Sequence, residues 1–289
     1  MSLDAKLTAA REELASRDGV LVAFSGGVDS SVVAALAHDA LGDDAVACTA
    51  KSETLPAAEL DDAKRVAEEI GIRHEIVEFS ELEDPQFVAN DGDRCYHCRT
   101  MRLGRMYEAA AELGIGTVCD GTNADDTDGG HRPGLEAVHE LDVTSPLLAH
   151  GLTKAEVREA AERYGLSVAD KPSMACLSSR IPTGLDVTEE KLTRIEHAEA
   201  LLREWGFSQF RVRDHDGLAR IEVGADELQV ALDPDFAAAA RERLTEIGFD
   251  HVTLDLAGYQ TGSVSPEGED DADRSTVEEV LAADYPTGE

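Results

Sequence analysis

Short apolar runs alternate with amphipathic segments along the first 150 residues of the chain. The apolar runs have the length of buried strands, and the segments between them carry apolar residues at helical spacing. Strands that alternate with helices predict a parallel sheet covered by helices, with ligands at the carboxyl ends of the strands. The expected strands are 20–24, 45–50, 73–79 and 116–120, and the expected helices are 4–17, 30–41, 56–70 and 100–113.

The pattern changes after residue 150, where helices and strands no longer alternate regularly. Thr153 and Glu156 form a capping box at the start of a helix expected up to residue 165. Farther along, the turn H-D-G joins two strand-like runs into an expected hairpin. The expected elements here are the helices 152–165, 187–205, 225–232 and 235–247 and the strands 209–214, 218–223 and 251–254.

These elements predict two domains and a tail. We expect an α/β domain at 1–185, built on the parallel sheet, and a second, smaller α+β domain at 186–262. The remaining segment, 263–289, contains the acidic run P-E-G-E-D-D-A-D-R, which is typical of a disordered tail.

The first apolar run leads directly into a glycine-rich turn, in the order V-L-V-A-F-S-G-G-V-D-S-S. Gly26 and Gly27 allow the backbone to approach a phosphate closely, and the N-terminus of the following helix favours negative charge. Ser25 and Ser30 add hydroxyl donors, and Asp29 is a candidate ligand for Mg²⁺. The loop lacks the G-K-[S/T] ending of a Walker A motif, so it predicts a phosphate site of another kind; the alternative is an ordinary turn.

Other polar groups follow the expected strands and share the same edge of the sheet. Lys51 comes directly after the second strand, and the segment D-G-T-N-A-D-D runs from Asp120 to Asp126 after the fourth. These carboxylates are candidates for holding Mg²⁺ or contacting a ribose, and a solvated acidic loop is the alternative. Arg132, in the turn G-G-H-R-P-G, is a candidate for binding an anion.

The five cysteines divide into two kinds. Cys48 and Cys119 lie inside expected strands, where a cysteine acts as a small buried hydrophobe. Cys95 and Cys98 form a C-x-x-C, a spacing that suits zinc, an iron–sulfur cluster or redox chemistry. In a reducing compartment such residues are metal ligands or reactive thiols rather than disulfides. The fifth, Cys176, is the candidate partner of this pair.

Cys176 lies in an aperiodic stretch, 166–184, that gathers a thiol, several hydroxyls and two cations. Long ordered loops of this kind are usually functional. Lys171 and Arg180 flank the cysteine, and positive charge nearby favours the reactive thiolate. Ser179 and Arg180 are candidates for binding the phosphate of an adenylate.

The hexapeptide S-G-G-V-D-S resembles the PP-loop of the N-type ATP pyrophosphatases. Together with D-G-T-N-A-D-D, H-R-P-G, K-P-S-M-A-C-L-S-S-R-I-P-T-G and F-R-V-R, in this order, it resembles the LarE family of ATP-dependent sulfur transferases up to about Gly262. The resemblance implies a domain like the adenine nucleotide alpha hydrolases, in which ATP is cleaved between its α- and β-phosphates. AMP would then activate the carboxylates of pyridinium-3,5-biscarboxylic acid mononucleotide, and sulfur would replace oxygen to give the bis-thiocarboxylic acid mononucleotide for the nickel-pincer cofactor of lactate racemase.

The resemblance also implies a sulfur source. In one type of LarE protein the loop cysteine, which matches Cys176, gives up its own sulfur and becomes dehydroalanine. In the other type, three cysteines hold a 4Fe-4S cluster whose fourth iron carries an exchangeable hydrosulfide. Because this chain has Cys95, Cys98 and Cys176, we expect the cluster-bearing type, supplied by sulfide or another sulfur donor. A zinc site in which His97 or another histidine supplies the fourth ligand is the alternative.

Further residues match family positions in the C-terminal part. Glu199 matches an active-site glutamate, and Arg211 and Arg213 match arginines that bind phosphate where subunits meet, which implies a nucleotide-like substrate and a homo-oligomer. Alternation along a strand places both arginines on one face, and the alternative is a solvated face paired with residues such as Glu222. The catalytic group that the resemblance implies is Asp29, Cys176, Arg180 and Glu199.

The charge of the chain limits its partners. There are 26 Lys and Arg residues against 60 Asp and Glu, a formal net charge of −34. Such a charge repels nucleic acid, which argues against tRNA thiolation, another PP-loop activity. We expect a cytoplasmic protein with a surface adapted to high salt and no membrane partner, since no apolar run has the length of a membrane span. A non-enzymatic nucleotide-binding module would leave the Cys176 loop unexplained.

Overall fold

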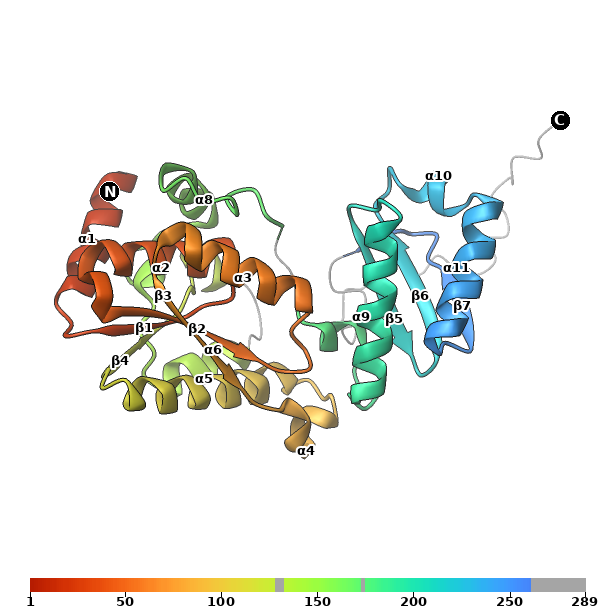
Figure 1. The fold of residues 1–289 in the computed structure, drawn as a ribbon, viewed down its shortest axis with the longest axis horizontal. Coiled ribbons are helices and arrows are strands. Elements are labelled where there is room, and N and C mark those ends of the chain that lie inside the picture. The colour runs from red at the N-terminus through yellow and green to blue at the C-terminus, as the bar shows by residue number, and fades with distance from the viewer. Residues whose placement is uncertain (128–132, 173–174, 261–289) are drawn as a thin grey trace, which may run out of the picture.

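The computed structural model describes residues 1–127, 133–172 and 175–260 of the 289-residue chain. Arg132 and the predicted acidic tail at 263–289 lie outside the described residues. The described chain forms two bodies, one around each of two sheets, that lie side by side along the long axis of Figure 1. The first sheet is parallel and the second is smaller and mixed, which confirms the predicted fold class.

A four-stranded parallel sheet with the strand order β3-β2-β1-β4 forms the centre of the first body. Its strands are β1 (Val20–Ala23), β2 (Ala45–Lys51), β3 (Arg73–Glu78) and β4 (Thr117–Cys119). Its helices are α1 (Leu3–Ala15), α2 (Val28–Leu41), α3 (Ala57–Ile70), α4 (Pro85–Val88), α5 (Arg94–Glu112), α6 (Pro133–Glu140), α7 (Pro146–Ala149) and α8 (Lys154–Arg163). Short 3₁₀ turns lie at η1 (Gly42–Asp44), η2 (Glu81–Glu83), η3 (Ala124–Thr127) and η4 (Leu177–Arg180).

Helices cover both faces of this sheet (Figure 1). Side chains alternate along β1, so Val20 and Val22 pack with α1, α2, α3 and α8 on one face, while Leu21 packs with α5 and α6 on the other. Burial on both faces explains why this strand is apolar throughout. The ends of the strands therefore remain as the places where a ligand can reach the sheet.

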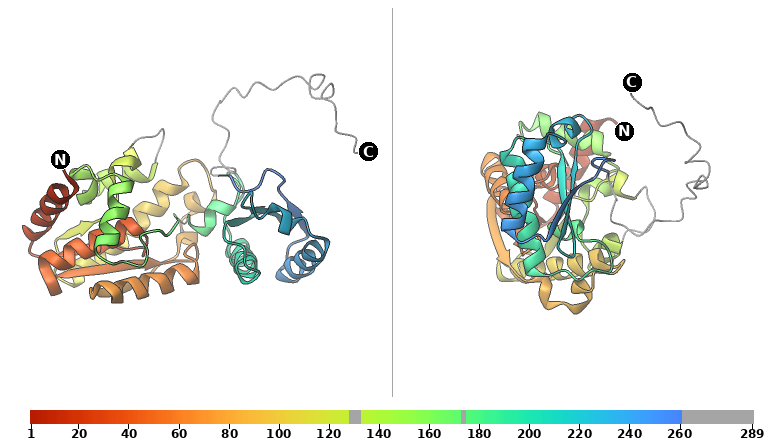
Figure 2. Two further views of the ribbon diagram at one scale, coloured as in Figure 1. Left: turned by 90° about the horizontal axis from the view of Figure 1, so that it is seen from above. Right: turned by 90° about the vertical axis from the view of Figure 1, so that its right-hand side faces the viewer.

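The second body is a three-stranded sheet with two longer helices on one face. Strands β5 (Phe210–His215) and β6 (Leu218–Val223) form the predicted hairpin, and β7 (His251–Leu254) pairs parallel to β6. Helices α9 (Glu189–Glu204) and α11 (Pro234–Ile247) cover the same face, as Figure 2 shows from above. Between β6 and α11, the short helix α10 (Leu228–Ala231) replaces the longer one expected at 225–232.

Helix α5 begins earlier than the sequence pattern predicts, and this changes the site. The expected helix was 100–113, whereas α5 starts at Arg94. Its N-cap, Asp93, is a residue type that often precedes a helix, but its first turn has no acidic side chain, so only part of the usual start signal is present. Cys95 and Cys98 consequently lie on the first turns of a helix.

A separate hydrophobic cluster joins the two bodies. It contains Phe87 of α4, Leu177 of η4 and Ile195 of α9, which come from three distant parts of the chain. Beside it, Glu196 accepts a hydrogen bond of 2.7 Å from the backbone N–H of Ala57 at the start of α3. The Cys176 loop, which precedes α9, therefore lies at the junction of the two bodies.

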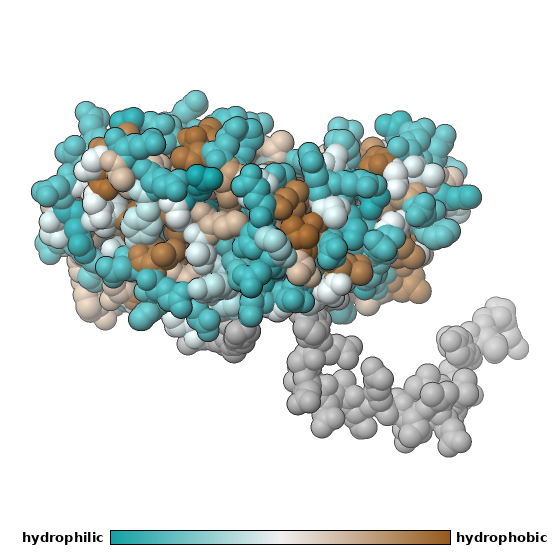
Figure 3. Space-filling model, turned by 90° about the horizontal axis from the view of Figure 1, so that it is seen from below, coloured by the Kyte–Doolittle hydropathy of each residue, from teal (hydrophilic) through white to brown (hydrophobic). Residues whose placement is uncertain are grey.

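The face of the molecule drawn in Figure 3 is mostly polar. Figure 3 shows a face on which hydrophilic residues predominate and apolar residues form small, separate groups. Within the described ranges, no helix is both long enough and apolar enough to span a bilayer. The adaptation to high salt stays a prediction.

Candidate active site

The loop between β1 and α2 has a backbone that requires glycine. Gly26 has a φ of +70°, and a Cβ at this position would lie 2.6 Å from the Cα of Ala63 in α3. Gly27 is the N-cap of α2, and its carbonyl accepts a hydrogen bond of 3.1 Å from the hydroxyl of Ser30. The same hydroxyl accepts one of 3.2 Å from the N–H of Ser25. The loop is thus held in shape at the N-terminus of a buried helix, where backbone N–H groups favour an anion.

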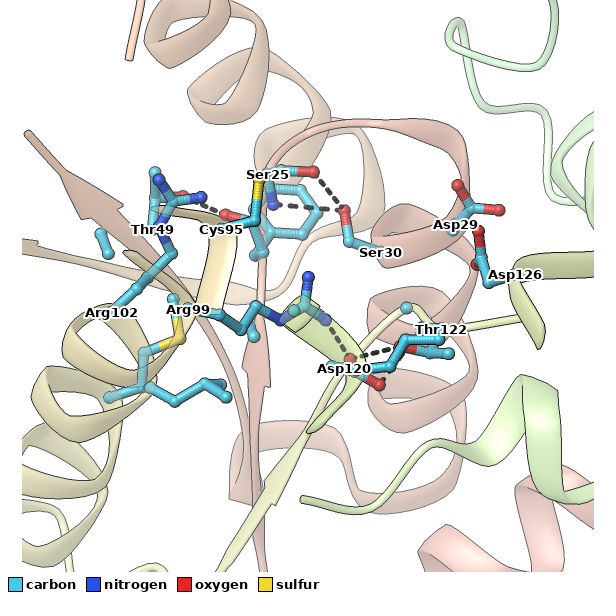
Figure 4. Close-up of a pocket in the computed structure, with 18 of the residues that line it drawn as sticks. Ser25, Asp29, Ser30, Thr49, Cys95, Arg99, Arg102, Asp120, Thr122 and Asp126 are labelled. Carbon is cyan, nitrogen blue, oxygen red and sulfur yellow. Dashed lines mark hydrogen bonds and ion pairs between the residues drawn. The ribbon is translucent and has the colours of Figure 1, made fainter. Parts of the chain in front are cut away.

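A cavity of about 540 Å³ opens beside this loop, at the carboxyl ends of β1, β2 and β4 (Figure 4). This volume is in the usual range for a small-molecule site. Lys51, which was expected here, does not line the cavity, because its ammonium pairs with Glu78 at 2.7 Å on the exposed edge of the sheet. The polar residues that line the cavity are Ser25, Asp29, Ser30, Thr49, Cys95, Arg99, Arg102, Asp120, Thr122 and Asp126.

Asp29 lies in the first turn of α2 and borders the cavity near Asp126 (Figure 4). One carboxylate oxygen accepts a hydrogen bond of 3.1 Å from the side-chain amide of Asn123. The other oxygen forms an ion pair with the ammonium of Lys154, the first residue of α8. Sequence reasoning missed Lys154, because the pattern of the chain gives no signal for a contact between residues 125 positions apart.

Asp120 is buried, and its carboxylate is occupied by groups of the protein. One oxygen accepts a hydrogen bond of 2.6 Å from the hydroxyl of Ser145. The other accepts one of 2.6 Å from the hydroxyl of Thr122 and pairs with Arg99. In this arrangement Asp120 fixes the loop after β4 and holds Arg99 at the cavity wall. Asp126 supports the same loop by accepting a hydrogen bond of 3.0 Å from the N–H of Asn123.

Helix α5 brings a thiol and two cations to the cavity. Cys95, Arg99 and Arg102 are spaced four and three residues apart, so they share one face of the helix. This spacing is visible in the sequence, but it becomes informative only when the helix is known to begin at Arg94. The face carries positive charge into a site that also contains the phosphate-type loop.

Cys98 points away from the cavity toward a buried carboxylate. Its thiol donates a hydrogen bond of 2.8 Å to Glu81, which also accepts one of 3.2 Å from Arg102. Glu81 is fully buried, and its other oxygen accepts hydrogen bonds from the hydroxyls of Ser52 (2.8 Å) and Thr54 (2.5 Å). Burial, together with the charge of Glu81, raises the pKa of Cys98 above its ordinary range, although Arg102 acts in the opposite direction.

Cys176 lies beside this group, at the start of η4. Its sulfur is 3.1 Å from the hydroxyl of Ser178. Cys176 is close enough to Cys98 for negative charge on its sulfur to raise the pKa of the Cys98 thiol, and both lie near the Arg102 guanidinium. Two of the three cysteines expected to act together therefore lie in the neighbourhood of Arg102, and the third, Cys95, borders the cavity on the same helix as Cys98.

The Cys176 loop is fastened on its C-terminal side. The N–H of Leu177 donates a hydrogen bond of 3.0 Å to the carbonyl of Thr54, which follows β2. Asn90 donates from its side-chain amide to the carbonyls of Pro182 (2.8 Å) and Leu185 (2.9 Å). These bonds attach the loop to the first body next to the cavity.

The thiols suit a metal site in their chemistry but are not arranged around a metal. Thiolates are the usual ligands of iron–sulfur clusters. Near these thiols, the buried Nε of Arg102 has no hydrogen-bond partner among the described residues. Over the same residues, no group of three or more His, Cys, Asp or Glu side chains is placed to hold a metal ion. His97, the alternative zinc ligand, lies 3.7 Å from a carboxylate oxygen of Asp84. Holding a cluster thus requires these side chains to rearrange.

The other two cysteines are structural. Cys48 and Cys119 are fully buried in β2 and β4, as expected for small hydrophobes. Burial raises the pKa of each thiol to about 12, so both stay protonated and unreactive at neutral pH.

Arg180 and Glu199 form a buried ion pair between η4 and α9. The guanidinium of Arg180 contacts both carboxylate oxygens of Glu199 at 2.9 Å, and neither residue is appreciably exposed. Arg180 also donates to the carbonyls of Ala175 (2.6 Å) and Cys176 (3.0 Å). Glu199 accepts a further hydrogen bond of 3.2 Å from the N–H of Val212 in β5. This arginine positions the backbone of the Cys176 loop.

Arg211 and Arg213 lie on one buried face of β5. Arg213 pairs with Glu222 of β6 (2.8 and 3.0 Å) and donates to the carbonyl of Ser179 at 3.0 Å. The guanidinium of Arg211 lies over the ring of Tyr259, and burial, with the charges of Arg180 and Arg213 nearby, lowers its pKa. Both arginines are buried, so this strand face is not solvated, but the cross-strand partner of that alternative, Glu222, is confirmed for Arg213. Phosphate binding by these arginines stays a prediction.

Comparisons with known proteins agree with this geometry. The asparagine synthase family matches residues 3–177. The chain is 41% identical to the uncharacterized protein slr1717 of Synechocystis over 91% of this chain and 98% of that protein. It is 35% identical to pyridinium-3,5-bisthiocarboxylic acid mononucleotide synthase of Lactiplantibacillus plantarum over 90% of this chain and 93% of that protein. A tRNA-specific 2-thiouridylase MnmA, from Maricaulis maris, is 30% identical over 59% of this chain and 51% of its own length.

The match to the family covers the parallel sheet, the glycine-rich loop and the start of the Cys176 loop, up to Leu177. The two relatives of similar length extend the likeness through the second sheet. Given this coverage, the chain belongs to the asparagine synthase family of PP-loop ATP pyrophosphatases, and over nearly its whole length it is related to the L. plantarum synthase.

Proposed function

We propose that the protein is an ATP-dependent sulfur transferase that converts the carboxylates of pyridinium-3,5-biscarboxylic acid mononucleotide into thiocarboxylates. The likeness to the L. plantarum synthase over nearly the whole of both chains supports this substrate. The observation that carries the proposal is that Arg102 links the phosphate-type cavity to the group of cysteines. This residue borders the phosphate-type cavity and also contacts the buried group of Cys98 and Glu81, next to Cys176.

The first step activates the carboxylate. A carboxylate oxygen of the substrate attacks the α-phosphorus of ATP, the bond from that phosphorus to the bridging oxygen breaks, and pyrophosphate leaves. Ser25, Ser30 and the N-terminus of α2 bind the departing pyrophosphate. Asp29, which borders the cavity, would hold Mg²⁺, and the bound ion would neutralise phosphate charge.

The second step replaces the activated oxygen. A sulfur nucleophile attacks the carbonyl carbon of the acyl adenylate, and AMP leaves with the electrons of the broken carbon–oxygen bond. Arg99 and Arg102 supply positive charge at the cavity wall, which favours a nucleotide substrate with several anionic groups. Cys95, Cys98 and Cys176 would hold a 4Fe-4S cluster, whose chemistry supplies an exchangeable hydrosulfide. The alternative sulfur source is Cys176 itself.

The test is incubation of the purified protein with ATP, Mg²⁺, a sulfide source and the biscarboxylate mononucleotide. We expect AMP and pyrophosphate to form, and the product to gain one sulfur in place of one oxygen at each carboxylate. Release of pyrophosphate without the substrate, or no sulfur in the product under anaerobic conditions, would contradict the proposal.

A second measurement identifies the sulfur source. Protein purified without oxygen is expected to contain iron and acid-labile sulfide and to absorb visible light. A colourless protein that contains zinc would refute the cluster. Loss of one sulfur atom from Cys176 after a single turnover, detected by mass spectrometry, would instead assign the sacrificial route.

The likeness to the 2-thiouridylase suggests tRNA as a control acceptor. That likeness covers 59% of this chain, and the net charge of −34 opposes binding to a polyanion. We expect no thiolated nucleoside when tRNA replaces the mononucleotide in the same assay, and efficient thiolation of tRNA would overturn the choice of substrate.

A further inference from the structure

Asn90 is the centre of a buried hydrogen-bond network between two segments that lie far apart in the chain. It has a φ of +55°, a conformation that asparagine tolerates better than most residues, and it is 1% exposed. Its side-chain amide donates to the carbonyls of Pro182 (2.8 Å) and Leu185 (2.9 Å). Its own carbonyl accepts a hydrogen bond of 3.0 Å from the N–H of Gly184. The segment before α5 therefore holds the residues that follow Cys176.

Arg94, the first residue of α5, extends this network to the Cys176 loop. Its guanidinium donates hydrogen bonds to the side-chain oxygen of Asn90, four residues before it, and to the carbonyl of Ser178 at 3.0 Å. Arg94 directly precedes Cys95, and the hydroxyl of Ser178 lies 3.1 Å from the sulfur of Cys176. One side chain thus connects the start of the helix that carries the C-x-x-C to the loop that carries Cys176.

The partners of Arg94 differ from those of two other arginines that contact this loop. Arg180 and Arg213 also donate to loop carbonyls, but each is paired with a buried glutamate. Over the described residues Arg94 has no carboxylate partner, and its guanidinium donates to two neutral oxygens. The hydrogen bond to Ser178 therefore does not compete with an ion pair, and the charge of the donor makes it stronger than a bond between neutral groups.

We propose that Arg94 is a positioning residue for sulfur transfer, which fixes the C-x-x-C helix against the Cys176 loop so that the cysteines of both segments stay in register. Such a role has a large effect, since a displacement of about 1 Å can slow a reaction about 100-fold. Arg94 is not among the residues that line the cavity, so it acts on the thiols and not on ATP. The inference rests on the proposed function in one respect, namely that Cys176 takes part in sulfur transfer.

Hydrogen exchange of the substrate-free protein, measured by mass spectrometry, tests the contact itself. The backbone N–H groups of Leu177, Gly184 and Val187 are hydrogen-bonded to the first body. In Arg94→Ala we expect these amides to exchange about 10- to 100-fold faster, the effect of losing a hydrogen bond from a charged group. Amides of β1 are expected to exchange as in the wild type, which distinguishes a local contact from a general loss of stability.

A reaction with ATP, Mg²⁺, a sulfide source and the biscarboxylate mononucleotide tests the consequence for chemistry. We expect Arg94→Ala to lower the rate of thiocarboxylate formation about 10- to 100-fold. The rate of pyrophosphate release and the half-saturating concentration of the mononucleotide are expected to stay unchanged. A residue that only stabilises the fold would lower both rates together, through the amount of folded protein.

Arg105→Ala is the matched control for both measurements. Arg105 is an exposed arginine of the same helix, where it pairs with Glu108, and its replacement is expected to change neither loop exchange nor sulfur transfer. Arg94→Lys, the conservative variant, is expected to recover part of the loop protection and part of the sulfur transfer together. If Arg94→Ala does not fold, Arg94→Gln takes its place. Full sulfur transfer in Arg94→Lys without recovery of loop protection would show that the charge acts and not the contact, and would overturn the inference.

The remaining outcomes are also distinct. Unchanged loop exchange in Arg94→Ala, or faster exchange with sulfur transfer at the wild-type rate, would overturn the inference and leave the proposed function standing. Equal losses of pyrophosphate release and thiocarboxylate formation would likewise overturn it. A wild-type protein that forms no thiocarboxylate would overturn the proposed function, whereas the exchange measurement needs no substrate and still decides whether Arg94 holds the loop.

Discussion

The two bodies of the molecule use charged side chains in opposite ways. At the cavity of the first body, Asp29 and Lys154 form an ion pair in which each side chain is about a quarter to a third exposed. At the junction with the second body, Arg180 and Glu199 are buried and satisfied by each other. Buried pairs of this kind resist separation, because either charge alone would lack solvation. The comparison teaches that burial and partners, more than residue type, separate a binding group from a structural one.

The largest effect on activity is expected for Cys176, in the loop next to the cavity. Replacement of Cys176 by serine is expected to abolish sulfur transfer completely while pyrophosphate release continues, because activation needs the phosphate loop and not the thiol. Product thiocarboxylate and pyrophosphate are measured in the same reaction. Cys119→Ala, in buried β4, is the control and is expected to retain both steps. Sulfur transfer by the serine variant would remove Cys176 from the mechanism.

The junction is tested by the stability of Arg180→Ala. This change leaves the carboxylate of Glu199 buried without its partner, and we expect the free energy of unfolding to fall by about 3–5 kcal/mol. Denaturant unfolding measures it. Arg163→Ala removes an arginine whose side chain is 43% exposed and is expected to cost less than about 1 kcal/mol. Equal losses in the two variants would contradict the structural role given to the junction.

Asp29→Asn is expected to act on activity and not on stability. We expect pyrophosphate release in the presence of Mg²⁺ to fall about 100-fold or more, because a charged group at the reacting phosphates is lost. The free energy of unfolding is expected to stay near that of the wild type. Asp39→Asn changes an exposed aspartate of the same helix, which pairs with Arg11, and serves as the matched control. A variant that releases pyrophosphate at the wild-type rate would place the metal and phosphate contacts elsewhere.

The smallest expected effect is a pH dependence of the free energy of unfolding, to which one histidine in each body contributes. Burial lowers the pKa of His74 in β3 and of His215 in β5 below the ordinary value of 6.5. Both are therefore neutral in the folded protein, and their contribution to stability is present above pH 6.5 and lost as the pH falls through the lowered values. We expect the free energy of unfolding to decrease over this range, and His74→Asn or His215→Asn to reduce the decrease. His139→Asn, at an exposed position of α6, is the control; a slope unchanged in both test variants would contradict this assignment.

The sequence allowed prediction of the first sheet because its signals are local. The apolar run before Ser25, the two glycines and the helix that follows are adjacent in the chain, and the strand–turn–helix order is enough to place them. The start of α5 was missed because its first turn lacks an acidic residue. The parallel pairing of β7 with β6 also has no local signal, since it joins segments on either side of α10 and α11.

The candidate site was predictable in its residue types and less so in their partners. Asp29 and Cys176 were identified from motifs, and the structure places Asp29 at the cavity and Cys176 beside Cys98. Lys154 and Glu81 were missed because their importance lies in contacts that tertiary packing creates, and neither belongs to a motif. Lys51 was expected at the site from its position after a strand, but its partner on the neighbouring strand holds it outside.

Asn90 and Thr54 fasten the Cys176 loop before any substrate arrives, and this has a consequence for the rate of the sulfur transfer proposed above. Ordering a backbone costs about 1–2 kcal/mol of entropy for each residue that is fixed. Here the side-chain amide of Asn90 and the carbonyl of Thr54 order residues on the C-terminal side of Cys176 during folding. In the proposed sulfur transfer, we therefore expect the activation entropy of the step at Cys176 to be less unfavourable than for a loop that must become ordered around each bound adenylate.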